Sequence, residues 1–340
     1  MSRKQWLLVE AERRWDAARL RRKAGRTPEN FRIDAYLGHG GPDGVVVRGR
    51  VLDNAPPTPA MEGEGIGASL RRSLSQFVTD ELPAVPLRVT VGDASVEVET
   101  DHEGYFRAEL RPSALADPWE DGWVELAGEY RGLTEHRTPV RVRVPSPDAR
   151  FGVVSDVDDT ILETGVQRVG QMLRQTFAGS ALTRTPFPGV AELYRDLAAV
   201  GGADNPVFYV SSSPWNLYSF LIGFLRHRDF PLGPLLLRDL IGTRDGRARK
   251  HERIAEVLDL HPHLSFVLIG DSGEKDPEIY ADIVREHPGR VLAVYIREVR
   301  LDPGDGRVEA VSDSWDHDVP FVLAADTDAV RRHLVEVGVL

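Results

Sequence analysis

The sequence contains no cysteine, and it has no hydrophobic run long enough to cross a membrane. The absence of cysteine excludes disulfide bonds, a thiol nucleophile and zinc sites built from thiolates. Charged residues such as Arg3, Lys4 and Glu10 interrupt the first segment, which argues against a secretory signal. We therefore expect a cytoplasmic protein without a transmembrane segment, and peripheral contact with a membrane stays open.

Positive charge is also in short supply. Lysine and arginine number 42 against 53 aspartates and glutamates, and the formal net charge is -11. This balance argues against nucleic acid as a partner, because domains that bind nucleic acid need a surplus of positive charge. The hydrophobic share of 41% is that of an ordinary folded protein, and 340 residues are enough for two domains.

Residues 1–28 predict a short basic helix with an apolar stripe at helical spacing, formed by Leu8, Ala11, Trp15 and Ala18. A basic helix that contains tryptophan can lie on an anionic membrane surface. The narrow stripe also fits a helix that packs on its own domain, and we favour this second interpretation.

Short runs of alternating apolar and polar residues dominate residues 29–148, as in Gly44–Leu52, Leu87–Gly92 and Val140–Val144. This period of two, with turn residues between the runs, predicts an all-β sandwich domain. No set of catalytic side chains stands out in it. We expect this domain to position the next one or to bind a partner, and the Pro/Ser linker Pro145–Asp148 to end it.

The stretch Phe151–Thr160 is where the sequence most clearly indicates chemistry. An apolar run suited to a buried strand ends in Asp156, Asp158 and Thr160, and ligands of open α/β sheets bind just beyond such strand ends. Residues two apart on an extended chain share a side, so both carboxylates can face one pocket. Paired carboxylates repel each other, which suggests a hard cation such as Mg²⁺ or an acid/base pair.

From residue 149 to residue 340, helical and strand patterns alternate, which predicts a doubly wound α/β domain with a parallel sheet. Ser211 and Ser212 directly follow one apolar strand, and Asp271 follows another. Parallel strands end along one edge of their sheet, so these polar residues can converge on Asp156.

Helix capping competes with function as an explanation for some of these residues. Ser213 before Pro214 and Asp276 before Pro277 are typical helix starts. Lys250 opens a further predicted helix, where a cation is unfavourable to the helix dipole, and this cost suggests a bound anion. The alternative is that Lys250 belongs to a solvated run of basic residues.

Together these residues fit phosphoryl transfer through a covalent aspartyl phosphate. Asp156 would attack phosphorus. Asp158 would donate a proton to the leaving alkoxide and then activate water, a double role that requires a raised pKa. Mg²⁺ held by Asp156 and Asp271 would offset charge repulsion, while Ser211 and Lys250 would bind phosphoryl oxygens.

The same residues, in this order, resemble the haloacid dehalogenase superfamily, whose phosphatases carry a D-x-D-x-T strand end, a later Ser or Thr, a Lys and an acidic stretch. Within that superfamily, Asp156–Ile161, Tyr209–Tyr218 and Gly270–Tyr280 are similar to the catalytic domain of actin-patch-type phosphatidate phosphatases. The resemblance covers roughly residues 150–325, whereas the sandwich domain is matched only in general character.

This resemblance implies a haloacid dehalogenase-like domain and a Mg²⁺-dependent phosphoric monoester hydrolase that converts phosphatidate to diacylglycerol. The catalytic residues would be Asp156 and Asp158. The phosphate-binding residues would be Thr160, Ser211, Ser212 and Lys250. The metal ligands would be Asp156, Asp158, Asp271 and Asp276.

Three other interpretations stay open. A phosphatase for a soluble or protein-borne phosphomonoester would use the same pocket chemistry. A phospho-acceptor signalling module would keep a long-lived phosphoaspartate, and a scaffold would not turn over at all. A proton donor such as Asp158 beside the nucleophile favours turnover.

Substrate choice must come from what covers the pocket. Two apolar stretches are candidates for contact with acyl chains, namely residues 164–185 and Trp215–Leu225. Each of them also fits ordinary packing within the domain.

Overall fold

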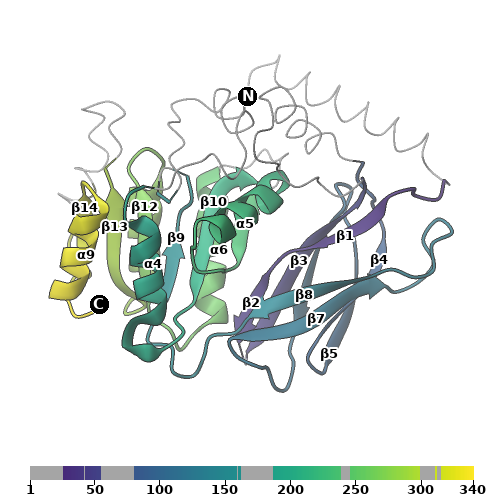
Figure 1. Cartoon of the computed structure of the whole chain (residues 1–340), viewed down its shortest axis with the longest axis horizontal. Helices are drawn as coiled ribbons and strands as arrows, with labels where there is room; N and C mark the ends of the chain where they lie inside the picture. The colour runs from purple at the N-terminus through teal and green to yellow at the C-terminus, as the bar shows by residue number, and fades with distance from the viewer. Residues whose placement is uncertain are drawn as a thin grey trace, which may run out of the picture.

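The computed structural model describes residues 26–41, 43–54, 80–158, 160–161, 187–238, 246–298, 311 and 315–340. Residues 1–25 of the predicted basic helix and the apolar stretch of residues 164–185 lie outside these ranges. The described residues form a β-sheet domain beside an α/β domain (Figure 1).

The first domain is one connected sheet of eight strands. Their bounds are β1 Phe31–Ala35, β2 Gly38–Gly41, β3 Gly44–Asp53, β4 Pro86–Val91, β5 Ala94–Glu99, β6 Tyr105–Leu110, β7 Trp119–Leu126 and β8 Arg137–Arg143. Neighbouring strands run antiparallel except β2 and β8, which run parallel. Every second side chain of β4 and β6 is buried, which is the physical origin of the period of two in the sequence.

Strand β3 connects the parts of this sheet, because it pairs with β1, β2 and β6. The apolar core of the domain is rich in valine and includes the fully buried Val47, Val89 and Val124. Burial of one such side chain contributes about 1.5–3 kcal/mol to folding. Gly40 lies near the end of β2, just before the tight connection to β3, and an added Cβ there would overlap the carbonyl oxygen of Gly44.

The second domain contains a sheet of six strands in which all pairs are parallel. Their bounds are β9 Gly152–Ser155, β10 Val207–Pro214, β11 Leu235–Arg238, β12 Phe266–Asp271, β13 Val291–Arg297 and β14 Phe321–Ala324. The order across the sheet is β11-β10-β9-β12-β13-β14. The chain therefore builds outward from β9 to one side and then to the other, and the crevice at such a reversal is where open α/β sheets bind ligands.

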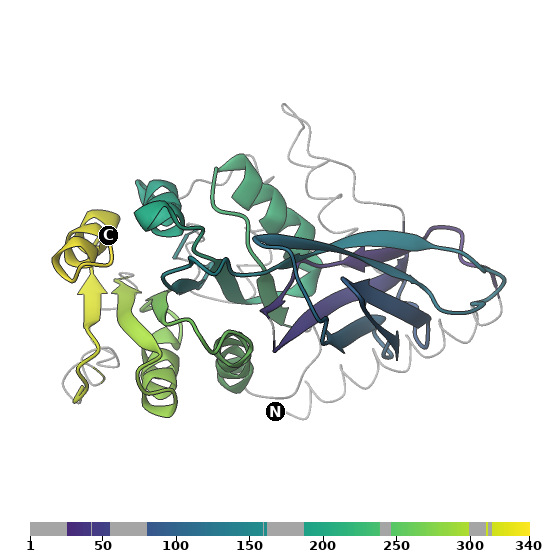
Figure 2. The same cartoon turned by 90° about the horizontal axis from the view of Figure 1, so that it is seen from below.

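Helices cover both faces of the parallel sheet (Figure 2). One face carries α4 Val190–Ala199, α5 Tyr218–His227 and α9 Thr327–Glu336, and the other carries α6 Gly246–Leu260 and α7 Asp276–Glu286. Short 3₁₀ turns, η1 Val200–Gly202 and η2 Trp215–Leu217, follow α4 and precede α5. Asp326 is the N-cap of helix α9, and its carboxylate accepts the Ala329 N–H at 2.8 Å.

The register of the central strands brings distant residues together. Ser155, the last residue of β9, lies beside Tyr209 of β10 and Ile269 of β12. The chain just beyond Ser155 therefore runs next to Ser211 and Asp271, which lie two positions further along the neighbouring strands. This geometry follows from the parallel pairing alone.

The two domains share a buried interface. Glu256 of α6 forms ion pairs with Arg48 of β3 and Arg107 of β6. Tyr36, in the connection between β1 and β2, packs into the apolar core of the second domain and not into that of its own. The first domain is therefore docked on the second by both charged and aromatic contacts.

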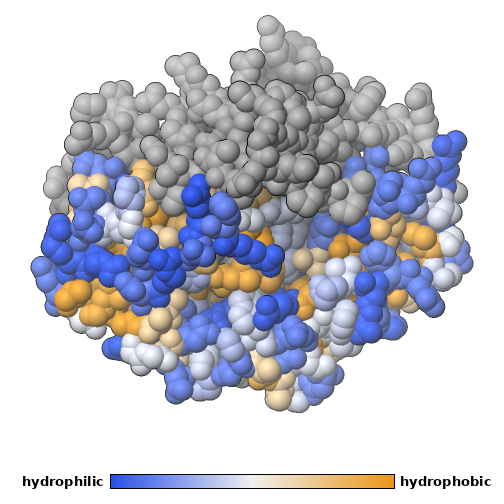
Figure 3. Space-filling view, viewed as in Figure 1, coloured by the Kyte–Doolittle hydropathy of each residue, from blue (hydrophilic) through white to orange (hydrophobic). Residues whose placement is uncertain are grey.

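Hydrophilic and hydrophobic residues are interspersed on the described surface of both domains in Figure 3. Large apolar side chains that are exposed include Leu323 of β14 and Val335 of α9. None of the described helices is both long and apolar enough to cross a membrane.

Candidate active site

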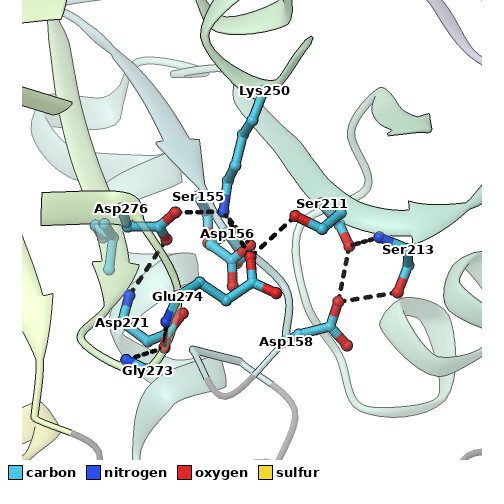
Figure 4. Close-up of polar contacts among 12 residues, drawn as sticks. Ser155, Asp156, Asp158, Ser211, Ser213, Lys250, Asp271, Gly273, Glu274 and Asp276 are labelled. Carbon is cyan, nitrogen blue, oxygen red and sulfur yellow. Dashed lines mark hydrogen bonds and ion pairs between the residues drawn. The ribbon is translucent and has the colours of Figure 1, made fainter. Parts of the chain in front are cut away.

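Asp156 follows β9 directly and lies at the carboxyl edge of the sheet. Its backbone N–H donates to the Ile269 carbonyl at 2.8 Å, so it continues the register of β9 by one residue. Its side chain is fully buried, and Oδ1 accepts a hydrogen bond of 2.7 Å from Nζ of Lys250. Figure 4 shows this carboxylate in the middle of a cluster of polar side chains.

Lys250 supplies the positive charge of the cluster. Its buried Nζ also donates to Oδ1 of Asp276, and Oε2 of Glu274 lies 3.6 Å away. Helix α6 begins at Gly246, so Lys250 lies one turn inside the helix. The predicted position at the helix start is therefore wrong, and so is the solvated alternative, because neighbouring carboxylates hold this cation.

Three buried carboxylates meet at this point. Asp156, Asp271 and Asp276 each place an oxygen within 4.8 Å of the others. Oδ2 of Asp156 and Oδ2 of Asp271 are buried without a hydrogen-bond partner among the described residues. The close approach depends on Gly270, since an added Cβ at this position would overlap the Asp276 carboxylate.

Burial is the largest cause of raised pKa values among these carboxyls. Burial and the repulsion of Asp276 and Glu274 raise the pKa of Asp271 to about 8, although Lys250 opposes this shift. Burial also raises the pKa of Asp156 well above its usual range, although Lys250 opposes this shift. Burial alone would lower the pKa of Lys250, but the surrounding carboxylates raise it well above its usual value. The cluster therefore has more negative charge than one lysine can balance.

A second group surrounds Asp158. The hydroxyls of Ser211 and Ser213 both donate to Oδ2 of Asp158, at 2.8 Å and 2.9 Å, and the Ser213 N–H donates to Oγ of Ser211 at 2.8 Å. Burial, with a smaller contribution from Glu274, raises the pKa of Asp158 to about 6, and the hydrogen bonds from the two serine hydroxyls oppose this rise. Because both donors use one oxygen, Oδ1 is the atom available to carry a proton.

Both capping interpretations of the sequence are wrong. Ser213 lies inside β10, and its hydroxyl donates to Asp158 and not to a helix N-terminus. Asp276 is the first residue of α7, but its side chain accepts from Lys250 and from the Asp271 N–H, the latter at 3.3 Å. The active-site contacts explain both residues better than helix starts do.

Most of the predicted site residues lie at this edge of the sheet. Ser212 donates from Oγ to Oε2 of Glu274 at 2.9 Å, and Thr160 has a buried Oγ1 without a partner among the described residues. In this structure Ser211 and Lys250 donate hydrogen bonds to the carboxylates of Asp158 and Asp156. To bind a phosphoryl group, each would have to give up such a contact for a phosphoryl oxygen. Their phosphate-binding role stays a prediction.

The carboxylate cluster fits a hard divalent cation. Two of its oxygens are buried and unpartnered among the described residues, and oxygen ligands with excess negative charge are what Mg²⁺ prefers. Three of the four predicted ligands are in the cluster, namely Asp156, Asp271 and Asp276. The carboxyl of Asp158 is engaged by the serines and is not among them.

Glu274 is a site residue that the sequence analysis misses. Its backbone N–H donates to Oδ1 of Asp271 at 3.0 Å, and its carboxylate accepts from Ser212. Glu274 therefore links the loop after β12 to the end of β10. Its place within the acidic run of residues 271–276 is the signal that could have identified it.

Buried carboxylates, a lysine and hydroxyls at the carboxyl edge of a parallel sheet form the kind of site that phosphoryl-transfer enzymes use. Residues 151–298 match the model of a family described as "Phosphatidate phosphatase APP1, catalytic domain". This segment, somewhat less than half of the chain, is therefore similar to that catalytic-domain family, and the predicted resemblance is confirmed for these residues.

Two curated relatives are similar to the same part of the chain. Phosphatidate phosphatase APP1 of Saccharomyces cerevisiae is 36% identical over 154 residues, which are 43% of this chain and 26% of that protein. An uncharacterized protein of Schizosaccharomyces pombe is 30% identical over 158 residues, 45% of this chain and 26% of that protein. The chain thus spans about a quarter of the length of each relative.

Two solved structures are distantly similar to this chain. A chain of the Pnkp1/Rnl/Hen1 complex has a TM-score of 0.33 at 16% identity, covering 45% of this chain and 51% of that one. A carbohydrate acetylesterase from Xanthomonas citri has a TM-score of 0.28 at 13% identity, covering 78% and 68% of the two chains. Similarity at this level carries no argument about function.

Proposed function

We propose that the chain is a Mg²⁺-dependent phosphatase that hydrolyses a phosphomonoester through an aspartyl phosphate on Asp156. The observation that carries this proposal is the meeting of two buried groups at one sheet edge. One group is the carboxylate cluster around Lys250, and the other is the Asp158 carboxyl with its two serine donors. The first suits a nucleophile with a cation, and the second suits a proton donor.

Asp156 is the nucleophile in this proposal. Lys250 holds Oδ1 at 2.7 Å, whereas Oδ2 has no donor among the described residues. The bond from the Asp156 carboxylate to phosphorus forms as the bond to the leaving oxygen breaks. Lys250 is close enough to exchange one carboxylate contact for a phosphoryl oxygen and so to stabilise the charge that collects there.

Asp158 handles the proton in both steps. Its Oδ1 donates a proton to the leaving alkoxide, and the resulting carboxylate later accepts a proton from the water that hydrolyses the aspartyl phosphate. Its pKa of about 6, set mainly by burial, allows both protonation states to be populated near neutral pH. This proton donor supports turnover over the signalling-module and scaffold alternatives.

Asp156, Asp271 and Asp276 are the residues that would hold Mg²⁺. When bound, the ion supplies positive charge that offsets the repulsion between the carboxylates and the phosphate. The chain itself provides the burial that keeps water away from this charge and the Gly270 position that lets the carboxylates approach.

Phosphatidate is the substrate that we propose first, with diacylglycerol as the product. The support is the family match over residues 151–298 and the relative named phosphatidate phosphatase. Trp215–Leu225 gives little support for acyl contact, since Leu221, Phe224 and Leu225 are buried in the domain core. A soluble or protein-borne phosphomonoester is the alternative substrate.

The test is phosphate release, with and without Mg²⁺, from phosphatidate in mixed micelles and from a panel of soluble phosphomonoesters. Asp156→Asn is the inactive variant, and Asp259→Asn, on the exposed side of α6, is the control. Release from phosphatidate that needs Mg²⁺ and Asp156 supports the full proposal. Release from soluble esters alone discards the lipid, and no release from either discards the phosphatase.

A further inference from the structure

The segment that follows Ser211 and Ser213 in the second domain is in contact with the first domain. Ser211 and Ser213 lie near the end of β10, and η2 begins two residues later at Trp215. The ring of Tyr36, from the first domain, stacks on the Trp215 indole with ring centroids 4.5 Å apart and planes inclined by 3°. A contact from one domain thus lies within two residues of an Asp158 partner in the other.

Further contacts join the same two segments. The rings of Tyr36 and Tyr218 lie 4.3 Å apart, and the Leu37 N–H donates to the Tyr218 hydroxyl at 2.7 Å. Nη1 of Arg50 donates to Oδ1 of Asn216 at 3.4 Å. The first domain therefore contacts three residues of the run from 215 to 218.

Both partners of the stack are buried. Tyr36 is 5% exposed and Trp215 is 7% exposed. Pro214 joins the serines to Trp215 in an extended conformation with φ at -75°. Because only Pro214, whose φ is restricted, separates the two residues, a displacement of Trp215 would also move Ser213. The Ser213 N–H donates to Ser211, and its hydroxyl donates to Asp158.

We propose that Tyr36 is a positioning residue for the reaction. Through Trp215 it fixes Ser211 and Ser213 against Asp158, so that the first domain completes the active site of the second. The family match begins at residue 151 and does not include this tyrosine. The inference rests on the proposed function, because the quantity that it affects is proton donation by Asp158.

The experiment compares kcat/KM for two substrates with different leaving groups. A leaving alkoxide, as in glycerol 3-phosphate or phosphatidate, needs a proton from Asp158, whereas the nitrophenolate of p-nitrophenyl phosphate leaves without one. We expect Tyr36→Leu to lower kcat/KM at least tenfold on the alkyl phosphate and less than threefold on the aryl phosphate. Tyr36→Phe keeps the stacked ring and restores both values.

Tyr130→Leu is the matched control within the first domain. Tyr130 is 8% exposed, its ring lies 6.4 Å from Phe31, and its hydroxyl donates to the Pro83 carbonyl, far from the serines. This change should lower the melting temperature and leave the ratio of alkyl to aryl kcat/KM unchanged. A purely structural role for Tyr36 would produce the same result as this control.

Tyr218→Phe is a milder variant in case Tyr36→Leu does not fold, because it removes only the hydroxyl that Leu37 contacts. It should shift the ratio in the same direction by a smaller factor. An active wild type with an unchanged ratio in both variants, or an equal shift in Tyr130→Leu, overturns the inference alone. Wild-type protein without turnover on either substrate overturns the proposed function as well.

Discussion

The Ser213 hydroxyl donates to Oδ2 of Asp158 at 2.9 Å, although the two residues lie 55 positions apart in the chain. Ser211 uses the same oxygen at 2.8 Å. Hydrogen bonds of this kind favour the ionised carboxylate, and they oppose the burial that raises the pKa of Asp158 to about 6. The two serines thereby limit how far burial raises the pKa of Asp158, and so they influence the pH range in which Asp158 can donate a proton.

Removal of one of these donors should shift the pH dependence of the reaction. Ser213→Ala takes away a hydrogen bond to a charged group, worth about 1.5–3 kcal/mol, and one pKa unit corresponds to about 1.4 kcal/mol. The pKa of Asp158 should rise by roughly one to two units. The protonated acid then persists to higher pH, so the alkaline fall of kcat/KM for an alkyl phosphate moves upward by the same amount.

The measurement is a pH profile of kcat/KM from about pH 5 to pH 9. Ser212→Ala is the control, because the Ser212 hydroxyl donates to Glu274 and not to Asp158. Its absolute rate can change, but its alkaline fall should stay at the wild-type pH. If the alkaline fall of kcat/KM moved by the same amount in both variants, the shift would not come from the hydrogen bond between Ser213 and the Asp158 carboxyl.

Lys250 should stabilise the fold mainly by balancing carboxylates. Lys250→Met leaves the buried charges of Asp156 and Asp276 without their cation, which costs about 3–5 kcal/mol at neutral pH. Because burial and mutual repulsion raise the pKa values of these acids in the folded state, they take up protons as the pH falls, and the repulsion decreases. The loss should therefore be smaller at pH 5.5 than at pH 7.5.

Urea unfolding of metal-free protein at these two pH values measures the loss. Lys275→Met, an exposed lysine next to the acidic run, is the matched control and should change the free energy of unfolding by less than about 0.5 kcal/mol. An equally large loss at both pH values for Lys250→Met would contradict charge balance and indicate that lost packing is the cause.

Mg²⁺ should stabilise the protein through the carboxylate cluster. An ion present at a hundred times its Kd adds about 2.7 kcal/mol to the free energy of unfolding, which is a shift of several degrees in Tm. Asp271→Asn should abolish this shift, and it should not lower the stability of the metal-free protein, since it removes one repelling charge. Asp121→Asn, at an exposed position of β7, should keep the shift.

Thermal unfolding over a series of Mg²⁺ concentrations measures this shift in Tm without an activity assay. Mn²⁺ in a parallel series compares a second oxygen-binding cation. If Asp271→Asn keeps the wild-type shift, Mg²⁺ binds elsewhere, and the assignment of the cluster as the metal site is wrong.

Several parts of the site could be predicted because they follow from local patterns. Asp156 and Asp271 each follow an apolar run, and parallel pairing then places them at one edge whatever the loops do. The apolar run at Val207–Val210 lies in β10 for the same reason. Strand ends are readable from sequence because burial on both faces leaves an unbroken apolar run.

The remaining features depend on contacts that no local pattern contains. Ser213 looks like a helix cap because Pro214 follows it, yet the strand continues and its hydroxyl meets Asp158. Lys250 looks solvated because basic residues surround it in sequence, whereas the fold buries it among acids. Tyr36 lies in a short connection, and only the docking of the domains brings it to Trp215.

The domain interface should make the protein sensitive to mild acid. His39 and His261 are buried there, 1% and 4% exposed, with ring centroids 5.7 Å apart. Burial lowers the pKa of His39 and lowers that of His261 well below its usual value, while Glu256, 3.3 Å from Nε2 of His39, opposes the shift of His39. Below about pH 6.5 the unfolded chain therefore binds more protons than the folded protein.

The free energy of unfolding should fall as the pH drops from 7.5 to 5.5, by up to about 1.4 kcal/mol per pH unit for each histidine. His261→Gln should remove the contribution of one histidine to this dependence of the free energy of unfolding on pH. Urea unfolding at several pH values measures it. His263→Gln, two positions away and exposed, should keep the wild-type slope. Equal slopes in both variants would show that His261 does not cause the acid sensitivity, since of these two histidines only His261 must leave a buried position to gain its proton.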